Sequence, residues 1–222
     1  MHGSGLSLDV AHMLAGGMVA LSFALIYQDR LFALLNVLAL QALALALALG
    51  WQGYIQNAPD LYVTAALAFL FKAVVVPMAL HRLIMRLRIH RTVENAVGVG
   101  MTMLLGVGLV ALSILVMMPL AAKSALIWED LSFALAVILL GLLLMISRRN
   151  AVSQIVGFIS MENGLMLAAA GARGMPLVIE ISISFSALIA LIVFGVSVFR
   201  IRERFESVDV HCLHSFRGDA GS

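Results

Sequence analysis

The chain has 222 residues, of which 63% are hydrophobic and 12% charged, and it carries a formal net charge of +2. Its mean hydropathy is +1.07. Soluble domains average about 25% charged residues and under about 50% apolar ones, so this composition excludes an ordinary cytosolic globule and a disordered chain. The single cysteine, Cys212, excludes an internal disulfide framework. The composition predicts a membrane protein, and nothing in it favours nucleic-acid binding.

Seven apolar segments are predicted to cross the membrane as helices, because a hydrocarbon core of about 30 Å takes roughly 20 helical residues. None alternates with a period of two, so each is expected to satisfy its own backbone hydrogen bonds in lipid. Short connections predict one all-α bundle over residues 1–199, followed by a polar cytoplasmic tail over 200–222. The shortest span starts directly after Glu129 and Asp130. The predicted spans are 10–27, 31–52, 61–84, 96–120, 131–146, 151–172 and 177–199.

The distribution of lysine and arginine predicts the orientation, because cytoplasmic loops carry an excess of these residues. With the N-terminus outside, Lys123 and Arg173 fall outside and Lys72 lies within a span. The C-terminus is then cytoplasmic, in a multi-pass protein of a bacterial or archaeal inner membrane. The remaining basic residues all fall inside: Arg30, Arg82, Arg86, Arg88, Arg91, Arg148, Arg149, Arg200, Arg202, Arg204 and Arg217.

Two ionisable residues are predicted near mid-membrane, where a charged side chain costs at least a few kcal/mol. Lys72 and Glu162 each lie about 16 Å from the start of their spans, which enter from opposite sides. Gln154 and Asn163 add polar groups to the helix of Glu162. The group predicts a proton-handling site, with Glu162 as its centre. A buried salt bridge that only fixes helix packing is the alternative, although such pairs rarely add net stability.

Other polar residues in the spans are assigned weaker roles. Glu180 lies in the first turn of its span, where an acid is favoured by the helix dipole, so capping is favoured over lining of a proton path. His12 is interpreted as an interfacial histidine. Asn36 and Gln41 are candidates for hydrogen bonds between helices. Pro77 is expected to kink the span that contains Lys72.

No catalytic centre or cofactor site can be assembled from the sequence. There is no phosphate-binding glycine loop, no Ser-His-Asp arrangement and no second pair of ligands to complete a metal site with His211, Cys212 and His214. We therefore expect a chain with no cofactor and no metal of its own, which is non-catalytic by itself.

Two stretches carry a resemblance to a known family. One runs Arg149-Asn-Ala-Val-Ser-Gln-Ile-Val-Gly-Phe-Ile-Ser-Met-Glu-Asn-Gly164, and the other runs Phe71-Lys-Ala-Val-Val-Val-Pro77. Both resemble the hydrogenase-4 component E family. The last three spans and the basic end are further similar to the K-type subunit of respiratory complex I and to the C subunit of multisubunit cation/proton antiporters.

The resemblance implies a membrane-arm subunit of a complex I-related assembly, coupled to a nickel-iron hydrogenase or a formate-hydrogenlyase-type module. Its partners would be other membrane-arm subunits, and Glu162 would take the place of the family's buried glutamate. Two positions depart from the complex I pattern. The corresponding glutamate of that subunit lies about one turn earlier, near Ile159, and its second buried acid would fall near Phe185 or Ser186. A sodium/proton antiporter subunit and a purely structural scaffold subunit are the alternatives.

Overall fold

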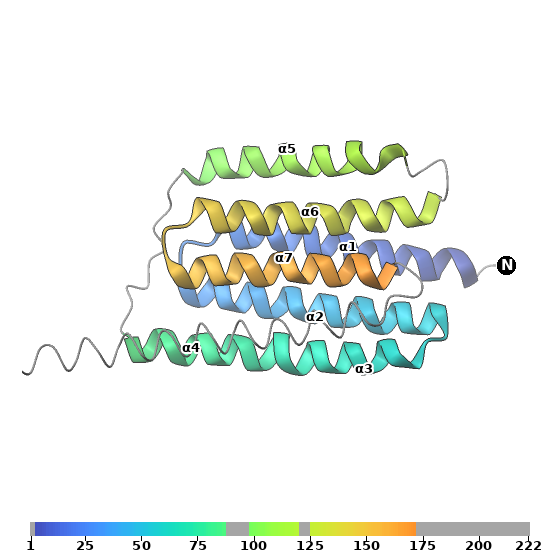
Figure 1. Ribbon diagram of the computed structural model, residues 1–222, viewed down its shortest axis with the longest axis horizontal. Coiled ribbons are helices and arrows are strands. Elements are labelled where there is room, and N and C mark those ends of the chain that lie inside the picture. Colours follow the sequence, from blue (N-terminus) through green and yellow to red (C-terminus); the bar gives the residue numbers. More distant parts are fainter. Residues whose placement is uncertain (1–2, 88–97, 120–124, 172–222) are drawn as a thin grey trace, which may run out of the picture. The chain divides into compact units, whose positions relative to one another are not determined.

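A computed structural model describes residues 3–87, 98–119 and 125–171, all within one compact unit, Met1–Ser182. These residues are helical, and no strand occurs among them (Figure 1). The expectation of an all-α protein is confirmed to this extent. The elements are α1 Gly3–Tyr27, α2 Leu31–Gln56, α3 Pro59–Ala68, the π-helical segment η1 Phe69–Val75, α4 Val76–Leu87, α5 Val99–Met117, α6 Ala125–Ser147 and α7 Ala151–Gly171.

Six stretches of these helices are long and apolar enough to span a bilayer, and they match the first six predicted spans. The seventh predicted span, 177–199, and the predicted tail, 200–222, lie outside the described residues. Glu129 and Asp130, which were predicted to lie just before the fifth span, are part of the helix α6, which begins about a turn earlier, at Ala125. The six stretches are Asp9–Tyr27, Leu31–Gln56, Pro59–Arg82, Val99–Met117, Glu129–Ser147 and Val152–Ala170.

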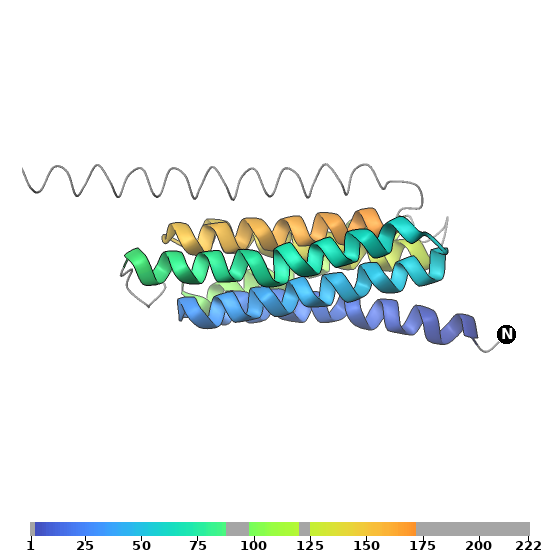
Figure 2. The same cartoon turned by 90° about the horizontal axis from the view of Figure 1, so that it is seen from below.

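The helices α1, α2, α6 and α7 form the centre of the bundle. In this group α1 packs on α2 and α6, and α7 packs on α2 and α6. α5 covers α6 and α1, while α3, η1 and α4 together run along α2 (Figure 1). Viewed from below, α1 and α7 lie on opposite sides (Figure 2). A core of large aliphatic side chains joins the centre, including Leu25, Leu34, Leu140 and Val156.

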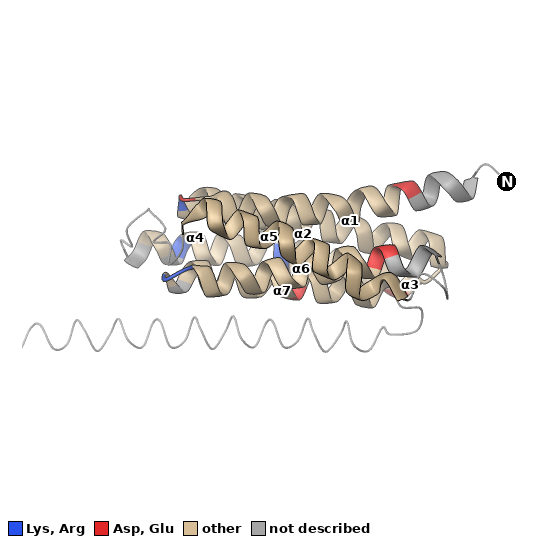
Figure 3. Cartoon of the chain, turned by 90° about the horizontal axis from the view of Figure 1, so that it is seen from above, with Lys and Arg blue, Asp and Glu red and all other residues tan. Residues whose placement is uncertain are grey.

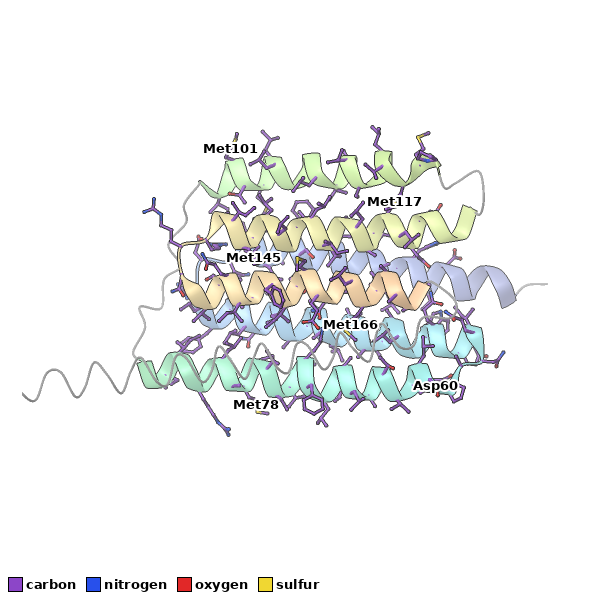
Figure 4. All side chains as sticks on the ribbon, in the orientation of Figure 1. Asp60, Met78, Met101, Met117, Met145 and Met166 are labelled. Atoms are coloured by element: carbon purple, nitrogen blue, oxygen red, sulfur yellow. The ribbon has the colours of Figure 1, made fainter. Side chains whose placement is uncertain are left out.

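The methionines show which surfaces face inward. Met166 of α7 is 1% exposed, whereas Met78 of α4 and Met101 of α5 are 47% and 54% exposed. Figure 4 shows Met78 and Met101 projecting away from the bundle, on its two outer helices. Exposed apolar side chains at these places suit contact with lipid.

Glycines bring the backbones of α6 and α7 into close contact. A Cβ atom added to Gly141 would lie 2.5 Å from the backbone nitrogen of Met161, and one added to Gly157 would lie 2.8 Å from that of Met145. Gly164 approaches the backbone of Ile138 in the same way, with 2.9 Å to its nitrogen. Without a strong hydrophobic force between helices in lipid, such close approach is a principal source of association.

The connection between α2 and α3 is a tight turn built on residues that favour it. Asn57 ends α2 with φ 51° and ψ 38°, a left-handed conformation that asparagine tolerates better than most residues. Pro59 then opens α3, where its missing N–H costs nothing. The turn makes α2 and α3 antiparallel neighbours, which places the following π-helical segment beside α2.

Apart from the residues near the middle of the bundle and Asp29, the described arginines and acids lie mostly at opposite ends (Figure 3). We call the end formed by the α1–α2 and α6–α7 connections the basic end, since it carries Arg30, Arg148 and Arg149. The opposite end, here the acidic end, carries four carboxylates. There His12 Nε2 of α1 lies 3.1 Å from Glu129 Oε2 and 3.6 Å from Asp130 Oδ1 of α6. The four are Asp9, Asp60, Glu129 and Asp130.

A buried arginine holds the end of α1 against the α6–α7 corner. The residue Arg148 is 3% exposed. Its Nη2 donates to the carbonyls of Ile26 and Gln28, the latter at 3.0 Å. Asp29 Oδ1 lies 3.8 Å from Nη1. Burial lowers the pKa of Arg148, and the charge of Asp29 opposes this shift. The guanidinium serves carbonyls that the end of a helix leaves without backbone donors.

We expect Gly141→Ala to lower stability by about 1–3 kcal/mol, because the new methyl group would overlap the α7 backbone. Gly108→Ala on α5 is the control, since a Cβ there meets nothing within 4 Å. Thermal unfolding of the two variants in one detergent makes the comparison. Equal melting temperatures would show that α6 and α7 are not in backbone contact.

We expect Arg148→Met to destabilise the chain by about 1–3 kcal/mol, because it leaves buried carbonyls of α1 unpaired. Arg149→Met is the matched control, because Arg149 is the exposed neighbour at the same corner. Denaturation followed by circular dichroism in detergent measures both. A loss no larger in Arg148→Met than in Arg149→Met contradicts the capping role.

Candidate functional site: a buried ion pair joined to an amide chain

The π-helical segment η1 positions Lys72 in the interior. The N–H of Val76, the residue directly after η1, donates to the Phe71 carbonyl five residues back. In a regular α-helix it would donate to the Lys72 carbonyl four residues back. Pro77 follows directly, and a proline in a regular α-helix has no N–H and clashes with the carbonyl four residues before it. The wider π register provides room at this point, and such single-turn segments are frequent at functional sites. Lys72, at the centre of η1, is 4% exposed.

Lys72 and Glu162 form an ion pair between η1 and α7. The Lys72 Nζ atom lies 2.9 Å from Glu162 Oε1, and the two side chains are 5% and 7% exposed. The two residues that the sequence placed at matched depth are therefore in direct contact. In a medium of low dielectric constant such a pair is strongly attractive, but each charge also loses its hydration.

A chain of side-chain amides extends from the ion pair toward α2. Lys72 Nζ donates to Asn163 Oδ1 at 3.2 Å, and Asn163 Nδ2 donates to Gln41 Oε1 at 3.3 Å. Asn163 and Gln41 are both fully buried. Asn163 was predicted from sequence to support the pair by hydrogen bonding, and the structure places its Oδ1 3.2 Å from Lys72 Nζ.

Two serine hydroxyls end the chain on α1 and α7. Gln41 Nε2 donates to Ser22 Oγ at 2.8 Å and to Ser160 Oγ at 2.9 Å. Ser22 Oγ in turn donates to the Met18 carbonyl at 2.9 Å. We call these six side chains the buried polar network. It draws on α1, α2, η1 and α7, and its members are Ser22, Gln41, Lys72, Ser160, Glu162 and Asn163.

The other predicted site residues lie elsewhere. Gln154 is exposed in the first turn of α7, and its Nε2 donates to the Arg148 carbonyl at 2.9 Å, so it is not in the network. Asn36 is exposed on α2. Glu180, His211, Cys212 and His214 lie outside the described residues. Within the described ranges, no group of three or more histidine, cysteine, aspartate or glutamate side chains is placed to hold a metal ion.

Sequence reasoning named Gln41 only as a general hydrogen-bonding candidate and did not connect Ser22 or Ser160 to the site. The signal available was position alone. Gln41 and Ser160 lie near the middle of their helices, where a polar side chain needs a partner in the protein. Which partner each one finds depends on the order of the helices in space, which hydropathy does not contain.

The fold and this network define a multi-pass membrane protein with a charged and amide-rich centre. Hydrogenase-4 component E of Escherichia coli K12 is 32% identical over 164 residues, which is 72% of this chain and 76% of that protein. The protein of the same name from Shigella flexneri gives the same values. The chain belongs to the hydrogenase-4 component E family.

A second relative covers more of the chain. An uncharacterised protein of Mycobacterium tuberculosis is 29% identical over 206 residues, which is 91% of this chain and 94% of that protein. No family model matches the chain, and no solved structure matches it.

Removing one member of the ion pair should be far more damaging than removing both. We expect Lys72→Met to cost about 3–5 kcal/mol, because it leaves a buried carboxylate without its cation. The double variant Lys72→Met/Glu162→Gln should recover most of that loss. Thermal unfolding in detergent measures this double-mutant cycle.

Arg82→Met serves as the control for loss of a cation. Arg82 is an exposed residue of α4, the helix that follows η1. If the stability losses of Lys72→Met and Glu162→Gln simply add in the double variant, Lys72 and Glu162 do not interact.

Proposed function

We propose that the chain is an integral membrane subunit of a hydrogenase complex related to complex I, in which Glu162 takes up and releases a proton. The observation that carries this proposal is the 2.9 Å contact between Lys72 and Glu162, both buried midway along apolar helices. Membership of a family whose relatives are named as hydrogenase-4 components supports the association with a hydrogenase.

The chemistry of the pair suits proton loading. Loss of hydration raises the proton affinity of a carboxylate, whereas an adjacent ammonium lowers it. A conformational change that lengthens the distance from Lys72 to Glu162, or that admits water, would therefore let the carboxylate take up a proton. Restoring the contact would release it. Intramembrane acids of this kind are typical of proton relays.

The proposal places the basic end in the cytoplasm and the N-terminus outside. Support comes from the described charges, since Arg30, Arg148 and Arg149 share one end and acids dominate the other. The chain would then contact other membrane-arm subunits and lipid in a bacterial or archaeal inner membrane. It would hold no cofactor, and the hydrogenase chemistry would belong to its partners.

The relations to the K-type subunit of complex I and to the antiporter C subunit belong to this proposal as well. One difference from the complex I pattern matters for this proposal. This chain has no acid at Phe185 or Ser186, where that pattern has its second buried acid. A single carboxylate with one lysine can bind and release one proton, so a complete path requires groups from partner subunits.

Glu162→Gln in the native complex should abolish proton movement while the complex still assembles, because the amide keeps the shape of the side chain but cannot bind a proton. Glu129→Gln is the matched control, as the same change at an acid of the acidic end. Inverted membrane vesicles with a pH-sensitive dye measure proton movement during hydrogenase turnover. Affinity purification of the tagged chain measures assembly.

The outcomes separate the proposal from its alternatives. Normal proton movement in an assembled Glu162→Gln complex contradicts the proton role. Failure of Glu162→Gln to assemble, together with assembly of the double variant Lys72→Met/Glu162→Gln, shows that the pair acts in packing and favours a scaffold subunit. Sodium-dependent proton movement in the unaltered complex would favour the antiporter assignment.

A further inference from the structure

The Lys72 ammonium has two acceptors of different chemical kinds. Glu162 Oε1 is a carboxylate oxygen at 2.9 Å, and Asn163 Oδ1 is a neutral amide oxygen at 3.2 Å. Uptake of a proton by Glu162 removes the charge from the first acceptor but leaves the second unchanged. The second acceptor therefore matters most in the state in which Glu162 is protonated.

The lysine fixes the direction of every hydrogen bond in the chain that follows. An ammonium can only donate, so the Asn163 atom that faces it must be the oxygen. Asn163 Nδ2 then faces Gln41 and requires an oxygen there, which turns both Gln41 Nε2 hydrogens toward Ser22 and Ser160. All acceptor oxygens of the chain thus face Lys72, and all donors point away from it.

This alignment favours a positive charge at Lys72. Each amide presents the negative end of its dipole toward the ammonium, and consecutive hydrogen bonds polarise one another in a low-dielectric interior. Gln41 is held by Ser22 of α1 and Ser160 of α7 at once, so it cannot turn without breaking three hydrogen bonds. The chain of side-chain amides is therefore a fixed hydrogen-bond acceptor for the Lys72 ammonium.

We propose that Asn163 and Gln41 hold Lys72 in its protonated form while Glu162 takes up a proton from water, so that the site gains one positive charge. One O–H bond of a hydronium ion breaks as one O–H bond forms on Glu162, and the three N–H bonds of Lys72 stay intact. Without the amide chain, the lysine would pass its own proton to the carboxylate, and the pair would become neutral with no net uptake. The two amides are positioning residues in this scheme, which rests on the proposed role of Glu162.

Neither η1 nor α7 carries another charged side chain that could substitute for the amides, and the described charged groups of α3 and α4, Asp60, His81 and Arg82, are exposed. Lys72 is the only ionisable side chain of η1, and Glu162 is the only one of α7. The ionisable groups of α1 and α6, which pack around α2 and α7, lie near the helix ends: Asp9, His12 and Tyr27 of α1 and Glu129 and Asp130 of α6. In α2 these groups are limited to Tyr54.

Infrared titration of the purified full-length chain in lipid nanodiscs tests the proposal, because a protonated carboxyl in an apolar site has its own stretching band. The band of Glu162 is assigned by its loss in Glu162→Gln. In Gln41→Leu we expect this band to persist to a pH about one unit or more above the point at which the unaltered chain loses it, a tenfold or larger change in proton binding. The physical reason is that Lys72, having lost its aligned acceptors, gives its proton to Glu162.

Gln56→Leu is the matched control on the same helix. Gln56 Nε2 also donates from α2 to α7, to the Ala170 carbonyl at 2.9 Å, but it is outside the buried polar network. A shift in Gln41→Leu and none in Gln56→Leu supports the proposal. Equal shifts in the two variants, or no shift in Gln41→Leu, would overturn it, since either result shows that the amide chain acts only in packing.

A second variant covers the case in which Gln41→Leu does not fold. Ser22→Ala removes only one acceptor of Gln41, and we expect a smaller shift in the same direction. No shift in Ser22→Ala would then count against the proposal. The vesicle experiment with Glu162→Gln decides the proton role separately, so an unshifted band leaves that role standing while it removes the amide chain from the mechanism.

Discussion

The ion pair between Lys72 and Glu162 is the interaction on which the centre of the bundle depends. Two opposite charges held away from water are costly to separate, since either one alone would be left in a medium that solvates it poorly. The pair therefore fixes η1 against α7, and the amide chain fixes α7 against α2 and α1. The same cost underlies the proposed proton exchange, in which a small displacement at this point changes the protonation of Glu162. In that proposal, stability and proton exchange depend on the same contact.

The surrounding structure keeps this contact in place from the far side of α7. Gly141, Gly157 and Gly164 let α6 and α7 approach until their backbones touch, so α7 has little freedom to rotate. Rotation of α7 would carry Glu162 away from η1 and Asn163 away from Gln41. The glycine contact is thus a steric constraint on an electrostatic site. On the other side of the pair, η1 is the segment whose backbone departs from a regular α-helix.

Much of this could be predicted from the sequence, and the limits have physical causes. Hydropathy located six of the helices, because the length of an apolar run reflects bilayer thickness. The rise of a helix also gave Lys72 and Glu162 the same depth, and the structure brings them into contact. Gln154 lies on the same helix as Glu162 but bonds to the corner at Arg148. Its position in the sequence did not reveal this, because the first turn of a helix offers backbone partners that compete with distant ones.

The π register of η1 and the chain through Gln41 could not be predicted. Pro77 indicated an irregular helix, but a proline is compatible with a kink or a bulge, and neighbouring helices decide between them. The start of α6 before Glu129 was missed for a related reason. Acids are poor membrane residues in isolation, and the sequence does not show that His12 Nε2 of α1 lies 3.1 Å from Glu129 Oε2 in the fold.

The contact made by Arg148 has a consequence for the order in which the chain is built. Its guanidinium serves carbonyls of α1 that were synthesised more than a hundred residues earlier. Until the ribosome has passed this arginine, the cytoplasmic terminus of the first helix, in the proposed orientation, must be solvated by water or lipid headgroups. Once the α6–α7 corner has been inserted, Arg148 can donate to the carbonyls of Ile26 and Gln28. Truncation upstream of residue 148 would therefore leave the carbonyls of Ile26 and Gln28 without this donor, although α1 could still pack on α2.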